Sequence, residues 1–296
     1  MKNFVKGSLS LGVSRITAGL NVNCCKYLIP LWLTPIYFVG LRLLFGTLFF
    51  WLLFIFDKPD TSTCKEKIKL LLLGAFMVFG YMSLSAIAIS YTTPMNFAIF
   101  NATQPMWVFL FSIVLRNEKV TIAKVLGILI GFSGVVATVF SESSQALARN
   151  PMIGNLIALL GAVVYAIYLL LSSALLRRVS NLTMLRYTFL GALFSTSISC
   201  LFTENSLPLL FWQPSLKPLL VIAFVLIFPT AINYLLISIG VKYLKATLVS
   251  MYGYITLLVA TLVSLLTGQD KLDIMLVLSM LLICIGIFMV GIAEKS

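Results

Sequence analysis

Ten apolar runs of about twenty residues each occupy most of this 296-residue chain. A hydrocarbon core about 30 Å thick takes roughly 20 helical residues to cross, and a backbone in lipid must satisfy its own hydrogen bonds. The runs therefore predict an all-α integral membrane protein, because the ten-residue alternation of a β-barrel is absent. The predicted transmembrane helices are residues 8–29, 36–56, 69–90, 94–115, 121–140, 152–175, 183–203, 218–240, 246–267 and 272–293.

The composition also fits a chain dissolved in lipid. Hydrophobic residues make up 60% of the sequence and charged residues only 10%, whereas a soluble domain carries about 25% charged residues. The sequence has no histidine and only nine acidic residues. This argues against zinc–histidine sites, Ser-His-Asp chemistry and two-metal carboxylate sites. We therefore expect no catalytic residue, no metal, no cofactor and no enzymatic activity.

The basic residues indicate how the chain is oriented. Roughly fourteen lysines and arginines fall in segments on the side of the N-terminus, and only three fall on the other side. The positive-inside rule then predicts that both termini face the cytoplasm. The net charge is +12, but the cations stand singly or in small groups between apolar runs. That spacing is typical of a membrane protein, so we do not expect nucleic acid as a partner.

The ten spans divide into two groups of five, separated by the polar residues 141–150. A shift of 152 residues pairs Gly134 with Gly286 and Glu118 with Asp270. Because each group has an odd number of helices, the second must enter from the opposite side, which gives two inverted five-helix repeats. The alternative is that apolar sequences simply align easily with themselves. The two predicted repeats are residues 1–145 and residues 146–296.

The first predicted span is the most polar of the ten. Ser14, Thr17 and Asn21 follow helical spacing and share one face, which either packs against other helices or lines a polar path. Arg15 and Lys26 lie on roughly the opposite side. We expect Arg15 to extend toward the cytoplasm and Lys26 toward the outer interface.

Other polar residues within spans are candidates for a binding site, because such groups usually face a partner helix or a water-filled cavity. In the fourth span, Pro105 removes a backbone hydrogen bond near Asn101, and the amides of Asn101 and Gln104 point to the same side. Pro229 and Gly253 would allow similar bends, so Pro105, Pro229 and Gly253 are the predicted hinges. For each polar side chain the alternative role is packing between helices. The residues predicted to contact a substrate are Asn21, Arg42, Tyr81, Asn101, Gln104, Trp107, Tyr165, Asn233 and Tyr252.

Two further patterns bear on packing and coupling. Gly127, Gly131 and Gly134 form a stripe of small residues that permits close helix contact, within one chain or between two copies. The protein could thus be a monomer or a homodimer. All nine acidic residues fall in loops or at the ends of spans, so the sequence offers no evident proton carrier within the membrane.

The first half of the chain carries a series of short motifs: Gly19-Leu20-Asn21 with Lys26, Pro35, Leu41-Arg42, Gln104-Pro105, Glu118, Gly127 and Gly134. The second half follows the same pattern less closely, with Asp270 in place of the glutamate and Leu257 in place of Pro105. Over nearly the whole chain, this pattern resembles the EamA-type branch of the drug/metabolite transporter superfamily. The resemblance implies ten helices around a central cavity lined by helices 1, 3, 4, 6, 8 and 9. Glu118 and Asp270 precede apolar runs, and we expect them to stabilise helix N-termini.

The sequence therefore predicts a multi-pass permease of the plasma membrane, which in a bacterium is the inner membrane. It would move a small polar or amphipathic metabolite, such as an amino acid, nucleoside or purine, by alternating access. Its partners would be that metabolite and the lipid bilayer. The alternatives are an organic-phosphate or nucleotide-sugar carrier, which the cations inside spans would suit, and a membrane-embedded enzyme acting on lipid-linked substrates.

Overall fold

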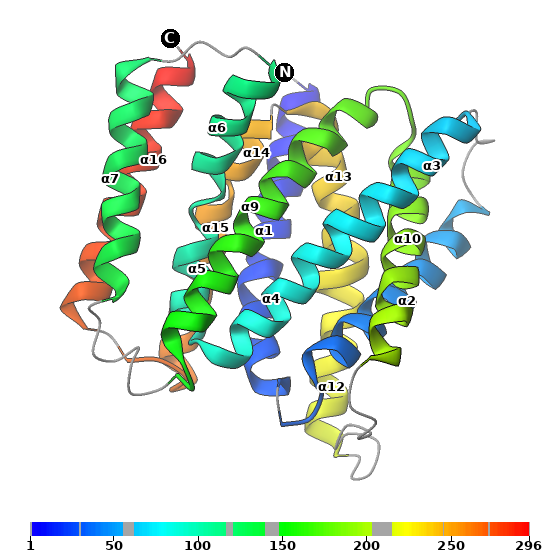
Figure 1. Cartoon of the computed structure of the whole chain (residues 1–296), viewed down its shortest axis with the longest axis horizontal. Helices are drawn as coiled ribbons and strands as arrows, with labels where there is room; N and C mark the ends of the chain where they lie inside the picture. Colours follow the sequence, from blue (N-terminus) through cyan, green and yellow to red (C-terminus); the bar gives the residue numbers. More distant parts are fainter. Residues whose placement is uncertain are drawn as a thin grey trace.

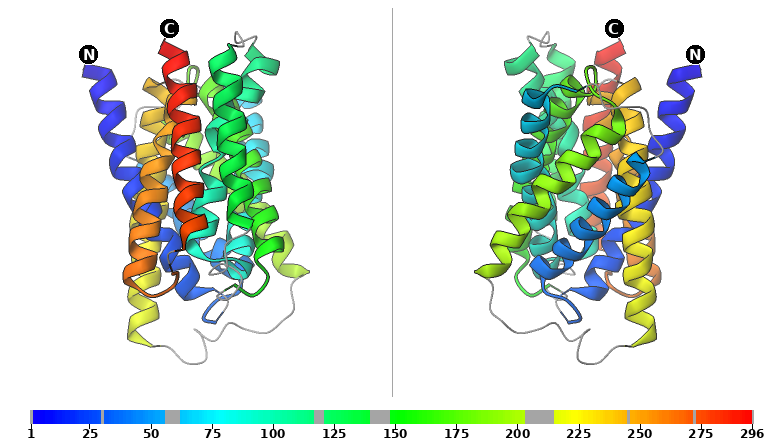
Figure 2. Two further views of the ribbon diagram at one scale, coloured as in Figure 1. Left: turned by 90° about the vertical axis from the view of Figure 1, so that its left-hand side faces the viewer. Right: turned by 90° about the vertical axis from the view of Figure 1, so that its right-hand side faces the viewer.

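A computed structural model describes residues 2–29, 31–55, 62–116, 121–139, 148–202, 215–244, 246–271 and 273–295, which contain helices and no strand. The helices lie side by side in one bundle, with the two chain ends at the same end of it (Figures 1 and 2). The predicted all-helical fold is confirmed over these residues.

Most of the predicted linker, residues 141–147, lies outside the described residues. The helices are α1 (Lys2–Leu28), α2 (Pro35–Phe54), α3 (Cys64–Leu73), η1 (Gly74–Val78), α4 (Phe79–Tyr91), α5 (Pro94–Asn101), α6 (Gln104–Arg116), α7 (Ile122–Val139), α9 (Pro151–Leu175), α10 (Asn181–Leu201), α12 (Leu216–Val225), η2 (Leu226–Ile232), α13 (Asn233–Tyr243), α14 (Ala246–Met251), α15 (Gly253–Leu266) and α16 (Ile274–Lys295).

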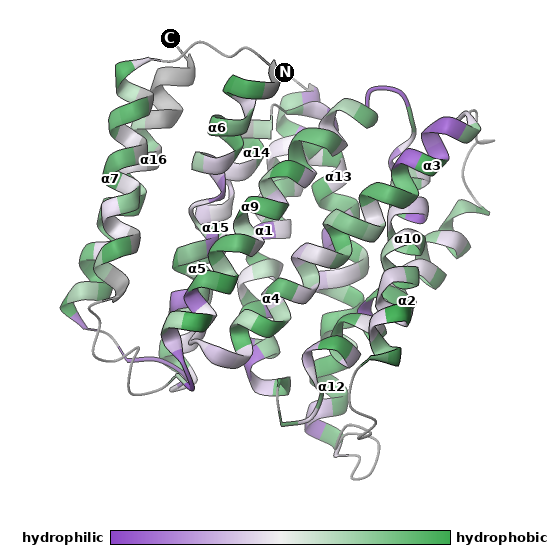
Figure 3. Cartoon of the chain, viewed as in Figure 1, coloured by the Kyte–Doolittle hydropathy of each residue, from purple (hydrophilic) through white to green (hydrophobic). Residues whose placement is uncertain are grey.

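Several helices have the length and polarity of membrane spans. Six helical segments are long and apolar enough to cross a bilayer, and apolar residues cover most of the bundle's length while polar residues gather near its ends (Figure 3). Large apolar side chains such as Leu48, Phe194 and Phe288 are exposed on the outside of the bundle, where lipid would cover them. The six segments are Pro35–Phe54, Cys64–Tyr91, Pro94–Val114, Pro151–Leu175, Leu216–Tyr243 and Leu248–Leu266.

The contact between α7 and α16 is built on glycine. A Cβ atom added at Gly286 would overlap the backbone of Gly127 and Gly131, and one added at Gly134 would lie 2.8 Å from the Ser279 carbonyl oxygen. Both helices stand together at one edge of the bundle (Figure 1). The glycine stripe of residues 127–134 therefore packs two helices of the same chain, which was one of the two roles expected for it.

Two of the long helical segments are interrupted near the middle of the bundle. One break separates α5 from α6 at residues 102–103, and the other separates α14 from α15 at residue 252. Pro105 was expected to kink a continuous helix, but it lies in the first turn of α6, where its missing N–H group costs no hydrogen bond. Pro229 lies within the π-helical segment η2, whose wider turn accommodates a residue that cannot donate a backbone bond.

Candidate functional site

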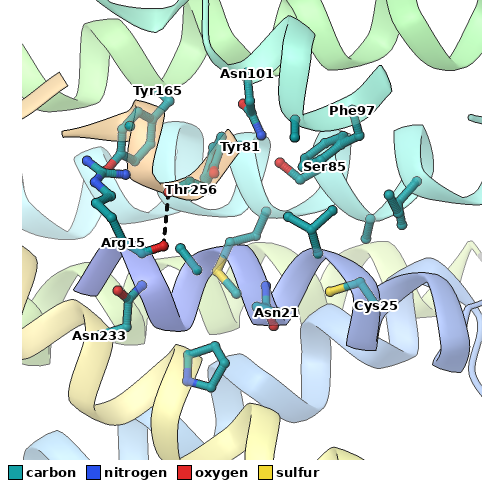
Figure 4. Close-up of a pocket in the computed structure, with 18 of the residues that line it drawn as sticks. Arg15, Asn21, Cys25, Tyr81, Ser85, Phe97, Asn101, Tyr165, Asn233 and Thr256 are labelled. Carbon is teal, nitrogen blue, oxygen red and sulfur yellow. Dashed lines mark hydrogen bonds between the residues drawn. The ribbon is translucent and has the colours of Figure 1, made fainter. Parts of the chain in front are cut away.

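A cavity of about 90 Å³, lined by both polar and apolar side chains, lies between the helices of the bundle. Residues of α1, α2, α4, α5, α9, α13 and α15, together with Gln104 of α6 and Pro229 of η2, line it (Figure 4). Of the predicted substrate contacts, Trp107 and Tyr252 lie outside the lining, as does the predicted hinge Pro105. The cavity brings together the other predicted contacts and hinges: Asn21, Arg42, Tyr81, Asn101, Gln104, Tyr165, Asn233, Pro229 and Gly253.

The break between α5 and α6 places two amides on the cavity wall. The Gln104 side-chain amide donates a 2.9 Å hydrogen bond to the Asn101 side-chain oxygen across the break. Because Pro105 has no N–H group, it cannot donate to the Asn101 carbonyl one turn earlier. Asn101 points into the cavity from α5 (Figure 4). The pair is thus pre-oriented, and each amide keeps hydrogen-bonding capacity for a bound molecule.

Arg15 is a lining residue that sequence reasoning assigned elsewhere. Instead of extending toward the cytoplasm, it is 6% exposed, and its Nη2 atom donates to the Tyr165 hydroxyl at 3.3 Å and the Val249 carbonyl at 3.4 Å. Its guanidinium lies beside the Tyr165 ring at the cavity (Figure 4). Neighbouring helices enclose this part of α1, so the side chain turns inward. A cation deep within a span was the signal that could have marked it.

Other residues of α1 occupy roles that only partly match expectation. Asn21 lines the cavity, whereas the Ser14 hydroxyl donates a 2.6 Å bond to the Asn233 side chain and joins α1 to α13. Lys26 was expected to extend toward the outer interface, and that stays a prediction. Its ammonium donates to the carbonyls of Ile89 and Thr92, at 3.1 and 2.7 Å, at the C-terminal end of α4. A cation is favourable there because the helix dipole is negative at that end.

Arg42 joins α2 to the neighbouring π-helical segment η2. Its Nε atom donates a 2.9 Å bond to the Thr230 hydroxyl, and Nη2 lies 3.5 Å from the Pro229 carbonyl. Its guanidinium lies 5.5 Å from the centre of the Phe38 ring. The side chain is 8% exposed. Arg42 therefore holds the position of η2 while presenting positive charge to the cavity.

Two predicted contacts lie outside the cavity lining. The Trp107 indole packs against Phe111 and Phe132, with ring centres 6.4 and 5.6 Å away, and its N–H donates to the Thr103 hydroxyl. Tyr252 occupies the break between α14 and α15. Trp107 follows Gln104 by three residues within α6, but its ring turns toward Phe132 of α7 rather than into the cavity.

A buried carboxylate lies at the loop between α15 and α16. Asp270 is 3% exposed, and it accepts hydrogen bonds from the Met95 backbone N–H at 2.8 Å and the Ser264 hydroxyl at 2.5 Å. Burial raises its pKa above the ordinary value, and the hydrogen bonds and the nearby Lys26 oppose that shift. Asp270 does stabilise a helix N-terminus, but it is that of α5 rather than of the helix that follows it. Glu118, its predicted counterpart, lies outside the described residues.

The comparison with known proteins decides the family. The EamA-like transporter family matches residues 5–140 and, a second time, residues 152–292. The chain belongs to this family. It is 24% identical to the uncharacterized transporter YyaM of Bacillus subtilis (strain 168) over 229 residues, which cover 75% of this chain and 72% of YyaM. It is 27% identical to YvbV, another uncharacterized transporter of that strain, over 88% of this chain and 84% of YvbV.

A solved structure supports the fold. A protein whose crystal structure has been determined shares 19% sequence identity and superposes with a TM-score of 0.68 over 99% of this chain and 98% of its own. Together with the family match, this makes the chain a multi-pass transporter of the plasma membrane. The expected resemblance to EamA-type transporters is thereby confirmed.

Proposed function

We propose that this EamA-family transporter is a permease that carries a small polar or amphipathic metabolite through the central cavity by alternating access. One observation carries the proposal: polar side chains from both halves of the chain converge on one cavity, at the breaks of two interrupted helices. Interrupted helices expose backbone groups near the middle of a bundle, which is where secondary transporters bind their substrates. Asn21, Asn101, Gln104 and Asn233 would contact the metabolite. No step of this function requires catalysis.

The proposed architecture is ten crossings in two inverted repeats, residues 1–145 and 146–296. The observed helix boundaries support it, because the shift of 152 residues that relates the sequence halves also relates the structural elements. The start of η1 at Gly74 corresponds to that of η2 at Leu226, and the start of α7 at Ile122 to that of α16 at Ile274. The packing shows the same symmetry between the halves. The first helix of one half packs on the third span of the other: α1 packs on α13, and α9 packs on α4.

The proposed movement bends the bundle around its irregular segments. Pro229 and Gly253 lie on the cavity where η2 and the break before α15 leave backbone groups without regular helical bonds. Pro105 lies one residue beyond the lining residue Gln104. Bending at these three points would let the helices around them rock against the rest of the bundle and open the cavity to either side in turn.

Transport by purified protein tests the proposal. The protein would be reconstituted into liposomes loaded with unlabelled lactate, succinate, glycerol 3-phosphate, leucine, adenosine or choline, and entry of the same labelled compound would be followed. We expect exchange of at least one compound to exceed that of protein-free liposomes about tenfold or more. A carrier that releases labelled substrate inside can return with unlabelled substrate bound, so label accumulates without net transport. If correctly folded protein exchanges no member of this panel, the proposed function is wrong.

The orientation makes a separate prediction. If the termini are cytoplasmic, Cys64, which is exposed at the start of α3, faces the cytoplasm, and the exposed Lys217 at the start of α12 faces outward. In a variant with alanine at the other four cysteines, a membrane-impermeant maleimide should label Cys64 only in inverted membrane vesicles. With Cys64→Ser and Lys217→Cys added, only intact cells should be labelled. The reverse pattern would place both termini outside.

A further inference from the structure

Two buried arginines line the cavity, and no acidic residue of the described part of the chain lines it to neutralise them. Arg15 of α1 and Arg42 of α2 both line it, together with Tyr81 and Tyr234. Among the described residues that line the cavity, none is aspartate or glutamate. Because guanidinium groups stay protonated in proteins, this small space holds two positive charges.

Bonds to the protein leave both guanidinium groups incompletely satisfied. The bonds of Arg15 to Tyr165 and Val249 are 3.3 and 3.4 Å long and come from one nitrogen, and its buried Nε atom has no acceptor. The bonds of Arg42 to Thr230 and Pro229 use two of its five N–H groups. All these acceptors are neutral. A buried charge that has only neutral partners is costly, and an anion between the two arginines would lower that cost.

We infer that the carried metabolite is a small organic oxyanion, with a carboxylate or a phosphate held by Arg15 and Arg42. This inference rests on the proposed permease function and narrows its substrate class. Guanidinium binds both oxyanions through paired, charge-assisted hydrogen bonds. A cation would be repelled, and the ammonium of an amino acid would find no carboxylate in the wall. The side-chain oxygen of Asn21, buried without a donor, would accept a bond from a hydroxyl of the same metabolite.

The size of the cavity limits the anion. Its volume of about 90 Å³ is well below the roughly 300–1,000 Å³ of pockets that bind drug-sized molecules. In this conformation the cavity holds an anion of a few carbon atoms and excludes a nucleotide sugar. Of the alternative function, an organic-phosphate or nucleotide-sugar carrier, only the transport of small phosphate esters is compatible with this volume.

Matched pairs of charged and neutral compounds test the inference. The exchange assay would use lactate with lactamide and glycerol 3-phosphate with glycerol, each as a competitor of the best carried compound. We expect the anion of at least one pair to compete at a concentration about tenfold or more below that of its neutral partner. The lactate pair tests carboxylate and the glycerol pair tests phosphate. If leucine, adenosine or choline is exchanged and both anions compete no better than their partners, the permease stands and the inference is wrong.

Variants of the two arginines assign the effect to this cavity. Arg15→Gln and Arg42→Gln should each weaken anion competition about tenfold or more, because a charge-assisted bond is lost, and should abolish the preference over the neutral partner. Arg15→Lys and Arg42→Lys, which keep the charge, should retain part of that preference. Arg178→Gln removes an exposed cation outside the cavity. It should change neither the strength of anion competition nor the preference over the neutral partner. Thermal stabilisation of each purified variant by lactate and by glycerol 3-phosphate gives an independent readout. Unchanged anion preference in both glutamine variants would overturn the inference.

Discussion

Replacing Asn101 by alanine together with Gln104 by leucine is expected to lower transport about 100-fold while the protein stays folded. These amides face the cavity at the break between α5 and α6, and their mutual bond joins them across it. A substrate that loses two hydrogen bonds in a site shielded from water binds about ten times less tightly for each. The initial rate of exchange at substrate concentrations below saturation, with the melting temperature of the same preparation, measures the effect.

A matched variant separates this effect from a general loss of amides. Asn181→Ala removes a side-chain amide that bonds the Ser238 hydroxyl outside the cavity, and it should leave transport within about twofold of the unmodified protein. The single variants, Asn101→Ala and Gln104→Leu, should each show an intermediate loss. Unchanged transport in the double variant would mean that the substrate does not pass between these amides.

The positions of the helices could be predicted because lipid leaves the backbone few choices. Run length indicates where the helices lie, and each predicted span is mostly helical over its described residues, with the breaks at 102–103 and 252 inside two of them. The stripe of Gly127, Gly131 and Gly134 also indicated close helix packing, which the structure places between α7 and α16. These features depend on local sequence and on the solvent, so a single chain is enough to recognise them.

The direction of individual side chains was less predictable, because it depends on neighbours distant in the sequence. Arg15 could reach the cytoplasm or turn inward with equal local geometry, and only the enclosing helices decide between them. Trp107 lies one turn after Gln104 in α6, but its ring packs against Phe111 and Phe132 instead of lining the cavity. The amides of Asn101 and Gln104 were recognisable because a proline in an apolar run marks an irregularity of the helix.

Replacing Gly74 by leucine, or Gly191 by leucine, is expected to cause the largest loss of stability of any single substitution considered. A Cβ atom at Gly74 would overlap the Thr188 carbonyl oxygen of α10, and one at Gly191 would overlap the Leu71 carbonyl oxygen of α3. Backbone cannot move aside as a flexible side chain can, so the helices must separate along their contact. Overpacking of this kind costs about 3 kcal/mol or more, which corresponds to a melting temperature lower by about 5 °C or more.

Glycines elsewhere in the bundle provide the control for this prediction. A Cβ at Gly12 of α1 meets no atom within 4 Å, and one at Gly80 of α4 is 3.6 Å from the nearest atom, a Val164 side-chain carbon. Gly12→Ala and Gly80→Ala should therefore leave the melting temperature in detergent within about 2 °C, or raise it slightly through better helix propensity. If Gly74→Leu and Gly191→Leu melt at the same temperature as these controls, α10 does not pack backbone to backbone on α3 and η1. Because α10 also packs on α2, and α2 carries Arg42 and packs on η2, the support for this side of the cavity would then have to come from another pair of helices.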